Sequence, residues 1–290
     1  MQKVLRYFPP GSEWLYYKIY MGSSTSEMYL AEILSYMQDL LEKKIIDNWF
    51  FINYNDPDRH IRVRLHLLNP EIDLATVMIQ IKGSLATLIK SKIVTRVEIA
   101  TYNRELERYG RESIKDFEIL FHLNSDLVIR IIKHTQNDPE KRWLWCMKSL
   151  DSLMGLWGLS LIQKRDLFEY LKNGFGNEMG ANKYIYKQLS DKYREKRQLI
   201  EFSLGGNEEE LVELLDQHNK YAIGYVENII KKRDLSNFDT LYFTLEGYIH
   251  MHCNRLFSSR QRMNEWVIYD FLFQYYRSQV ARNKYQEISR

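Results

Sequence analysis

The chain of 290 residues has only two cysteines, Cys146 and Cys253, and neither lies in a CxxC or cysteine–histidine pattern. This spacing predicts no zinc site and fits a reducing compartment. The sequence also has no glycine-rich phosphate loop, no Ser-His-Asp order and no metal-ligand spacing. We therefore expect neither a metal centre nor a nucleophilic triad.

Long apolar runs are missing as well. No segment reaches the length of about 18 consecutive apolar residues that indicates a membrane-spanning helix. The N-terminal stretch MQKVLRYFPPGSEW lacks the apolar core of a signal peptide. We therefore expect no membrane span and a cytoplasmic protein.

Neither sign of charge is in large excess, because 41 basic residues face 38 acidic residues, for a net charge of +3. This balance does not predict direct contact with nucleic acid. The hydrophobic fraction of 45% is ample for a sizeable core, and aromatic side chains, including 21 tyrosines, supply much of it. The length fits one large domain or two packed subdomains.

Strand and helix signals alternate along the first hundred residues. Alternating patterns rich in β-forming residues predict four strands, at Trp14–Tyr20, Trp49–Tyr54, His60–Leu68 and Ile93–Tyr102. Apolar residues at helical spacing predict two helices, at Glu27–Ile46 and Pro70–Ile89. The order βαββαβ matches the ferredoxin-like arrangement. One face of such a sheet packs on the two helices, and the other face is free to bind a ligand.

Helical patterns dominate after Gly110. They cover Arg111–His134, Pro139–Leu159, Gln163–Asn173, Asn182–Phe202, Glu208–Lys232, Asn237–Phe257 and Ser259–Gln279. We therefore expect an α+β protein with a ferredoxin-like βαββαβ unit over residues 1–110 and a mainly helical portion over residues 111–290 packed on it. The two portions would form one compact functional unit.

A row of basic residues lies in the third predicted strand. Every second position carries a cation or a group that can become one: His60, Arg62, Arg64 and His66. A strand projects alternate side chains to one face, so these groups share a face and repel one another. The row predicts an anion site on a rigid strand. The alternative is a surface strand whose basic residues pair with acidic neighbours.

Two further motifs contain charged or titratable groups. In YNRELERYG, Tyr102–Gly110, Glu105 and Arg108 are three residues apart and would be neighbours on a helical turn, as a surface ion pair or as part of a carboxylate site. In HMHCNR, His250–Arg255, the first histidine is our candidate general base.

His250 shares one helical stripe with Glu246 and Asn254, at positions i, i−4 and i+4. A carboxylate four residues away orients an imidazole and raises its basicity. The alternative interpretation is a hydrogen-bonded core histidine. His252 points away from this stripe and is the weaker candidate.

Four segments together resemble a known family: GSEWLYYKIY from Gly11, the strand pair WFFINYNDPDRHIRVR from Trp49, YNRELERYG from Tyr102 and HMHCNRLF from His250. The chain resembles, from about Gly11 to Tyr276, the C-terminal domain of lantibiotic dehydratases, also called the thiopeptide-type bacteriocin biosynthesis domain. The ordered set is specific, whereas each segment alone is weak. Arg111 departs from a second glycine that is common in the family.

The resemblance implies that the chain eliminates glutamate from glutamylated serine or threonine of a precursor peptide and leaves dehydroalanine or dehydrobutyrine. It implies a separate tRNA-dependent glutamylating protein as partner, because the chain has no room for that part. It implies no metal and no organic cofactor. A homodimer is also compatible with it.

The resemblance also assigns roles. Arg62, Arg64 and Arg108 would hold the glutamyl group, since arginine grips a carboxylate with two hydrogen bonds. Glu105 would orient Arg108 or take part in proton transfer, and His250 would remove or relay the Cα proton. His252 and Asn254 would lie on the substrate side.

Two other functions fit the same resemblance. Some stand-alone relatives form the pyridine core of thiopeptides by a formal cycloaddition between two dehydroalanines. A non-catalytic subunit would bind a leader peptide, for example by strand addition to a sheet edge. An intact arginine cluster favours elimination, because a cycloaddition enzyme has no glutamate to bind.

Overall fold

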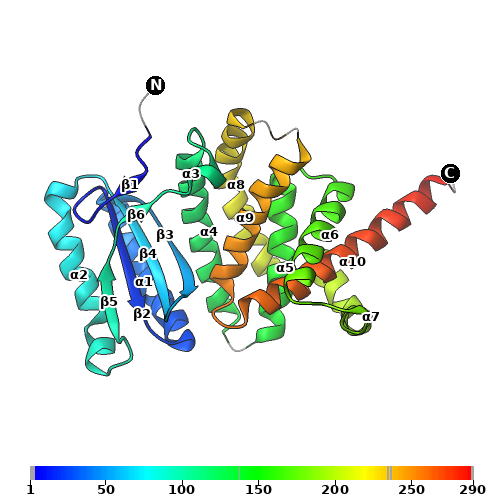
Figure 1. Ribbon diagram of the computed structural model, residues 1–290, viewed down its shortest axis with the longest axis horizontal. Helices are drawn as coiled ribbons and strands as arrows, with labels where there is room; N and C mark the ends of the chain where they lie inside the picture. The colour runs from blue at the N-terminus through cyan, green and yellow to red at the C-terminus, as the bar shows by residue number, and fades with distance from the viewer. Residues whose placement is uncertain (1–3, 137, 234, 236, 289–290) are drawn as a thin grey trace. The chain divides into compact units, whose positions relative to one another are not determined.

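The computed structural model describes residues 4–136, 138–233, 235 and 237–288 (Figure 1). The chain divides into two compact units. Unit 1 comprises Met1–Lys133 with Gly224–Ser259, and unit 2 comprises His134–Ile223 with Arg260–Arg290. Unit 1 contains a four-stranded antiparallel sheet, and the described part of unit 2 is helical.

The sheet of unit 1 has the predicted ferredoxin-like topology. Its strands are β2 (Trp14–Tyr20), β3 (Ile46–Asn55), β4 (Arg59–Leu67) and β5 (Arg96–Ile99), and its helices are α1 (Ser23–Glu42) and α2 (Pro70–Lys90). The strands lie in the order β3-β4-β2-β5, and all neighbours are antiparallel. Each helix therefore connects two strands that have a third strand between them. This confirms the α+β prediction for this region.

The predicted fourth strand was wrong in one respect. Instead of one strand over Ile93–Tyr102, the chain forms the short β5 and then β6 (Tyr102–Asn103), which pairs with β1 (Tyr7–Phe8) in a separate two-stranded sheet. Ala100 N–H still donates to Tyr16 O on β2, and past this point the chain leaves the main sheet. A two-residue partner near the N-terminus left no periodic signal in the sequence.

The two faces of the sheet differ in what covers them. Helices α1 and α2 lie side by side, joined by a hydrogen bond from Tyr36 Oη to Gln80 Oε1 of 2.9 Å. They bury the face of β4 that carries its apolar side chains, and these are at most 1% exposed: Ile61, Val63, Leu65 and Leu67. The basic row of β4 projects to the opposite face, as the alternation predicts.

The helices α4 (Ile114–His134) and α9 (Phe238–Leu256) also belong to unit 1, except for the last residue of α4, and they border β3 (Figure 1). Between β6 and α4 lies the short α3 (Leu106–Tyr109). The end of α8 (Glu209–Lys232) contributes an ion pair of 2.6 Å between Lys232 Nζ and Asp116 Oδ2.

Side chains of α4 and α9 cover the outer edge of β3, where alternate backbone groups have no strand partner. On α9, Asn254 accepts from Asn53 N–H and donates to Asn53 O, both at 2.9 Å, and Arg255 Nε donates to Phe51 O at 2.8 Å. On α4, Ser125 Oγ accepts from Phe51 N–H at 3.3 Å. The edge is thus satisfied by side chains in place of a strand.

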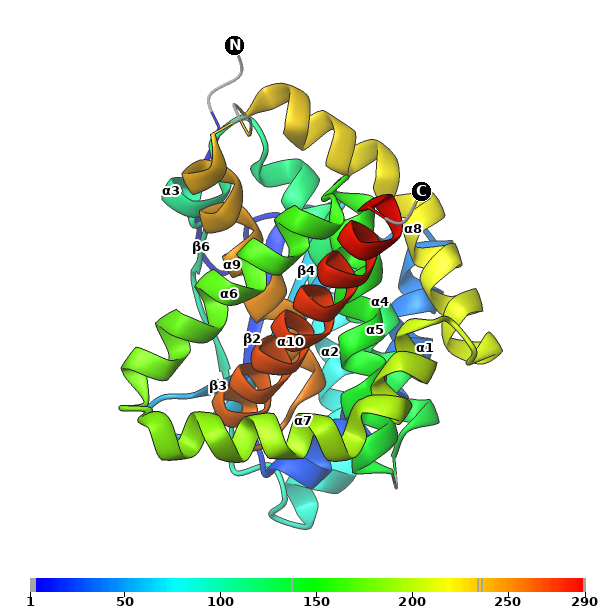
Figure 2. The same cartoon turned by 90° about the vertical axis from the view of Figure 1, so that its right-hand side faces the viewer.

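Unit 2 contains α5 (Pro139–Leu156), α6 (Leu161–Glu178), α7 (Lys183–Leu204), α10 (Gln261–Ile288) and the first part of α8. Polar caps begin three of these helices: Asp138, Ser160 in a full capping box, and Asn182. Helices α6 and α10 pack side by side, and α7 runs transverse to α10 and contacts it (Figure 2). The predicted helical pattern is confirmed, with ends shifted by a few residues and α6 and α10 extending furthest beyond their predicted ends.

We predict that replacing Asn254 by alanine destabilises unit 1 at the β3 edge. The change leaves the N–H and C=O of Asn53 without their partners, which should lower the free energy of unfolding by about 1–3 kcal/mol. Hydrogen exchange of the peptide covering β3, together with urea denaturation, measures the effect. Asn254→Asp keeps the acceptor and loses the donor, so it should fall between wild type and alanine. Unchanged exchange in Asn254→Ala would contradict this account.

Candidate functional site

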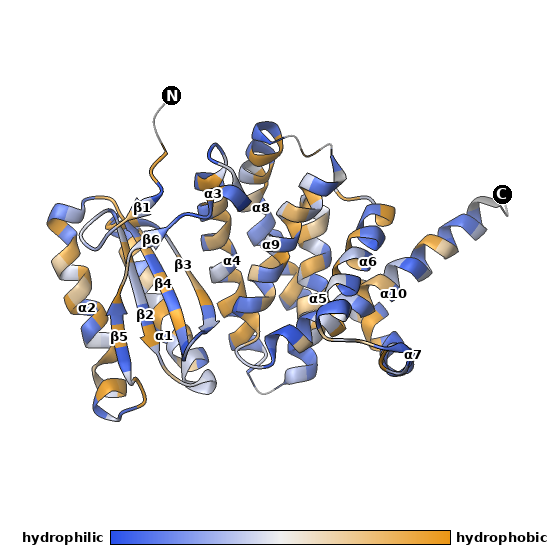
Figure 3. Cartoon of the chain, viewed as in Figure 1, coloured by the Kyte–Doolittle hydropathy of each residue, from blue (hydrophilic) through white to orange (hydrophobic). Residues whose placement is uncertain are grey.

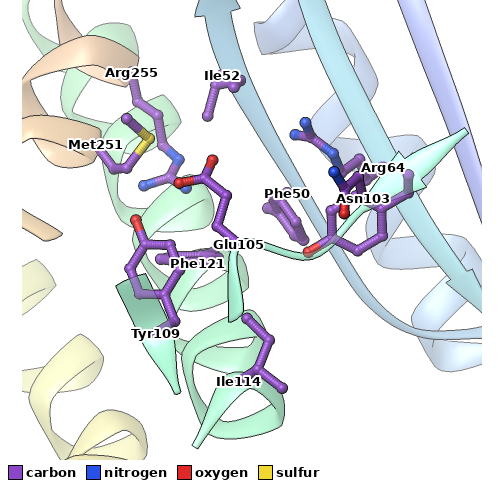
Figure 4. A pocket seen from close by; sticks show the side chains of 11 residues that line it. Phe50, Ile52, Arg64, Asn103, Glu105, Tyr109, Ile114, Phe121, Met251 and Arg255 are labelled. Atoms are coloured by element: carbon purple, nitrogen blue, oxygen red, sulfur yellow. The ribbon is translucent and has the colours of Figure 1, made fainter. Parts of the chain in front are cut away.

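A small pocket of about 40 Å³ opens in unit 1 on the face of the sheet that carries the basic row (Figure 4). Strands β3 and β4 supply one wall, and β6, α3, α4 and α9 supply the others. The lining residues are Phe50, Ile52, Arg64, Tyr102, Asn103, Glu105, Tyr109, Ile114, Phe121, Met251 and Arg255. In the view of Figure 4, Glu105 lies between the Arg64 and Arg255 sides of the pocket.

Arg64 is a buried cation enclosed by aromatic rings. Its residue is 8% exposed, and its guanidinium carbon lies 4.4 Å from the ring centre of Tyr16, 5.1 Å from that of Tyr102 and 5.2 Å from that of Phe50. Among the described residues, no carboxylate pairs with it, and its Nε has no hydrogen-bond partner. Cation–π contacts therefore hold the guanidinium in place and leave hydrogen-bond donors for another group.

A buried ion pair behind the pocket fixes one ring of this cage. Arg104 and Glu118 form two hydrogen bonds of 2.6 Å, and Tyr102 Oη donates to the same carboxylate at 2.9 Å. Burial, and next the Glu118 carboxylate, raises the pKa of Tyr102 well above its usual value. Tyr102 therefore stays neutral, with its ring held against Arg64.

Arg255 is the second buried cation of the pocket. Besides its bond to Phe51 O, its Nη1 donates to Asn124 Oδ1 at 3.0 Å, and Asn124 Nδ2 donates to His252 Nδ1 at 2.9 Å. Burial, with a smaller contribution from the charge of Arg64, lowers the pKa of Arg255 to about 10. His252 is fully buried within this network. Two cations thus face a pocket in which, among the residues that the structure describes, Glu105 supplies the one lining carboxylate.

Glu105 and Arg108 form the expected pair at α3. Arg108 Nε lies 3.6 Å from Glu105 Oε2, and the two side chains are 38% and 68% exposed, respectively. Arg108 also packs on α9, where a Cβ at Gly247 would come within 3.0 Å of Arg108 Cδ. The glycine therefore permits this close approach. Neighbouring Tyr109 is buried at the pocket wall, and burial raises its pKa to about 12.

The rest of the basic row is also held in defined positions. Arg62 stacks on Tyr54 at 3.3 Å from the ring centre, and its Nε donates to His60 Nε2 at 3.0 Å. His60 Nδ1 in turn donates to Asp58 O at 2.8 Å. Burial lowers the pKa of His60, and the charge of Arg62 lowers it further, so His60 is the neutral acceptor that aims Arg62. His66 pairs with Asp47 at 2.7 Å.

His250 lies on the partly exposed side of α9, in the stripe predicted with Glu246 and Asn254. Asn254 is engaged with β3, as described above. The neighbouring turn position, Met251, lines the pocket. The stripe therefore follows the side of the helix next to the pocket.

The structure brings together some of the predicted site residues. Of the seven candidates, Arg64 and Glu105 line the pocket, Arg108 pairs with Glu105, and Arg62 lies two residues from Arg64 on the same face. His252 and Asn254 belong to the hydrogen bonds that join α4 and α9 to one another and to β3. Their roles stay predictions.

Sequence reasoning missed three residues at the pocket. Arg255 is the last residue of the HMHCNR motif and lies one helical turn after Met251, which lines the pocket. Its place in this motif was the sequence signal that could have identified it. Tyr102 and Tyr109 flank the ELER segment, where a buried aromatic cannot be told from an exposed one by spacing alone. No group of three or more histidine, cysteine, aspartate or glutamate side chains in the described part of the chain is arranged to hold a metal ion.

Two curated relatives cover most of the chain. The subtilin biosynthesis protein SpaB of Bacillus subtilis is 28% identical over 265 residues, which cover 89% of this chain and 25% of the relative. The nisin biosynthesis protein NisB of Lactococcus lactis subsp. lactis is 26% identical over 270 residues, which cover 90% of this chain and 25% of that protein. The chain thus spans about a quarter of the length of the relatives it matches.

Solved structures share the fold. The tRNA dependent lantibiotic dehydratase MibB from Microbispora sp. 107891 matches 94% of this chain and 29% of its own, with a TM-score of 0.70 and 17% identity. The pyridine synthase TbtD from thiomuracin biosynthesis matches 90% of this chain and 97% of its own, with a TM-score of 0.56 and 9% identity.

The family model for the C-terminal part of the lantibiotic biosynthesis dehydratase matches residues 14–276. This match includes the basic row of β4, the ELER segment and the HMHCNR motif. The chain therefore belongs to this family of dehydratase elimination domains, and these domains are enzymes.

Proposed function

We propose that the chain removes glutamate from a glutamylated serine or threonine of a ribosomally made precursor peptide and leaves dehydroalanine or dehydrobutyrine. The observation that carries this proposal is Arg64, a buried guanidinium without a carboxylate partner among the described residues, in a pocket open to solvent. A buried charge without a counter-ion is unfavourable in the free protein. An anionic group of the substrate supplies the missing partner.

The reaction is a β-elimination. A base takes the proton from Cα of the modified residue, the electron pair forms the Cα–Cβ double bond, and the Cβ–O bond of the ester breaks. Glutamate leaves as a carboxylate with the electron pair of the broken Cβ–O bond, and a carboxylate is a much better leaving group than hydroxide. The protein must hold the glutamyl group, stabilise charge on the adjacent carbonyl and place the base.

Arg64 suits the role of anchor for the glutamyl carboxylate. Its aromatic cage fixes the guanidinium before substrate binds, so little side-chain freedom is lost on binding. Arg255 adds positive potential to the same pocket, while its Nε and Nη1 donate to Phe51 and Asn124. Arg62, two residues from Arg64 on β4, and Arg108, paired with the pocket residue Glu105, add further positive charge.

His250 remains the candidate base. It lies on the partly exposed side of α9, one residue before Met251, which lines the pocket. Glu246 lies four positions earlier on the same stripe of α9, and a carboxylate at this spacing orients the imidazole of His250. Glu105 is the alternative base, because it is the carboxylate of the pocket and is well exposed.

The partners follow from this reaction. The substrate is a precursor peptide that a separate tRNA-dependent protein has glutamylated. MibB is a tRNA dependent dehydratase, and the match covers 29% of its chain. This supports our proposal that glutamylation and glutamate elimination belong to different parts of a dehydratase system. A cytoplasmic location fits both partners.

The second candidate function is formation of a pyridine ring, because the fold also matches 97% of the pyridine synthase TbtD. A cycloaddition between two dehydroalanines involves no glutamate. Two buried cations around a pocket have no evident use in that reaction, which favours elimination. A purely peptide-binding role by strand addition at β3 is disfavoured, because Asn254, Arg255 and Ser125 already occupy the outer backbone groups of that strand.

We expect Arg64→Met to abolish elimination without unfolding the protein. Methionine keeps much of the side-chain volume and loses the charge, so kcat/KM for a synthetic glutamyl-serine peptide should fall by about 10²–10³-fold. The lost cation–π contacts are offset by relief from burying a charge, so the free energy of unfolding should change by less than about 1 kcal/mol. Mass spectrometry follows the loss of glutamic acid from the peptide.

The matched control is Arg96→Met. Arg96 also stacks on a tyrosine of the same sheet, 3.8 Å from the ring centre of Tyr20, but it is paired with Glu98 at 3.0 Å and lies outside the pocket lining. We expect nearly unchanged kcat/KM in this variant. Equal losses in both variants would show that general surface charge, and not the Arg64 site, drives the reaction.

Variants of Arg108 and His250 should separate binding from proton transfer. Arg108→Ala should raise KM for the glutamyl peptide, because a carboxylate contact is lost. His250→Ala should lower kcat by about 10²–10⁴-fold and leave KM nearly unchanged, because a base acts in the transition state. Normal kcat in His250→Ala together with an inactive Glu105→Gln would assign the base to Glu105.

If wild-type protein leaves the ester intact, the elimination proposal fails. The next substrate is then a peptide that already bears two dehydroalanines. Ring formation in that peptide would establish the second candidate function, and binding without any change in mass would indicate a peptide-binding subunit.

A further inference from the structure

Helix α2 carries apolar side chains on two opposite faces. One face packs on the sheet through Val77, Ile81 and Leu85, which are at most 2% exposed. The other face lies in solvent, with Ile72 75% exposed and Ile79 69% exposed. Figure 3 shows hydrophobic colouring along α2 beyond the part that meets the sheet. The described part of the chain does not cover this second face.

The exposed face follows a coiled-coil pattern. Its residues are Ile72, Ala75, Ile79, Lys82, Ala86 and Ile89, and all six are exposed. Their spacings are 3, 4, 3, 4 and 3, the heptad spacing of a helix that packs against another helix. We call these six residues the α2 seam.

The α2 seam is nearly the same when read in either direction. Placed antiparallel to a second copy, Ile72 meets Ile89, Ala75 meets Ala86, and Ile79 meets Lys82. The alanines let the two backbones approach closely. At the centre, the aliphatic stem of Lys82 can cover Ile79 of the other copy while its ammonium group reaches solvent.

The ends of the helix are complementary in charge. Glu71 and Asp73 lie in the first turn, whereas Lys90 and the following Lys92 lie at the end. An antiparallel pair places each acidic end beside the basic end of the other copy and also opposes the two helix dipoles. A parallel pair would bring like charges together at both ends.

We propose that two copies of this chain associate through the α2 seam, antiparallel and about a two-fold axis. A two-fold contact must be self-complementary, and the seam meets this condition in shape, in residue type and in end charge. A membrane surface is a poorer partner, because Lys82 lies in the middle of the exposed face of α2. The helix is long and apolar enough to cross a membrane, but one such helix is weak evidence for a membrane contact. The proposal is independent of the reaction proposed above.

The association should be weak and dependent on concentration. A helix of 21 residues is about 31 Å long, and packing one face of it buries less area than a standard stable interface. We therefore expect a dissociation constant in the micromolar range. Sedimentation velocity on the full chain should show the mass rising from 35.0 kDa toward twice that value as concentration increases.

The first test replaces the centre of the seam. Ile79→Lys should weaken association at least about tenfold, since it puts a second ammonium group beside Lys82 of the other copy. The matched control is Tyr184→Lys, because Tyr184 is also 69% exposed but lies on α7 of unit 2. Circular dichroism of both variants checks that they remain folded. A monomeric wild type at several hundred micromolar, or a dimer that Ile79→Lys leaves intact, would overturn the proposal.

The second test addresses direction. Glu71→Lys with Asp73→Lys makes both ends basic, and Lys90→Glu with Lys92→Glu makes both ends acidic, so each protein alone should dissociate more readily than wild type. A mixture of the two should associate again, and the chain with all four changes should regain wild-type behaviour. No recovery in the mixture would overturn the antiparallel arrangement. A wild-type monomer that floats with anionic lipid vesicles would instead assign the seam to a membrane surface.

Discussion

The hydrogen bonds between α9 and the outer edge of β3 are the contact on which the rest of unit 1 depends. They join residues about 200 positions apart, since Asn254 bonds with Asn53 and Arg255 bonds with Phe51. An exposed strand edge invites pairing with other chains, and here polar side chains close it. The same contact brings the HMHCNR motif beside the strand that pairs with the basic row. The pocket exists because these two segments are held together.

The cage around Arg64 shows how the fold keeps a cation available for a ligand. A carboxylate partner would satisfy the charge and block the site, whereas aromatic rings stabilise the guanidinium through their faces and leave its donors unused. The ring of Tyr102 is fixed by Glu118, which is already paired with Arg104. The buried carboxylate of Glu118 thus helps to hold the cage and does not neutralise Arg64.

Much of the fold follows from local pattern. Strand β2 matches its predicted bounds because the segment is rich in β-forming residues, and the helix of residues 70–90 begins at a proline, as expected. The alternation of β4 also placed His60, Arg62, Arg64 and His66 on one face correctly. It did not indicate which of them is buried, because that depends on Tyr16, Phe50 and Tyr102 from three other strands.

Long-range contacts account for what the sequence did not reveal. The break between β5 and β6 depends on two residues near the N-terminus, and the importance of Arg255 depends on Asn124 in another helix. His252 and Asn254 belong to a motif that resembles a catalytic segment, so the sequence predicts that both residues lie near the site. The motif alone cannot separate residues that hold the segment in place from residues that face the substrate.

The distribution of charge in the pocket bears on how a product leaves it. Arg64 lies deep, whereas Arg108 is more exposed and shares its charge with Glu105. In the proposed reaction, a glutamyl group attached to a peptide would be held at Arg64 through one free carboxylate, and breaking the ester bond would create a second. Free glutamate would then present more negative charge to the carboxylate of Glu105 than the ester did. Glu105 would therefore repel the product more strongly than the substrate, which would favour release after the reaction.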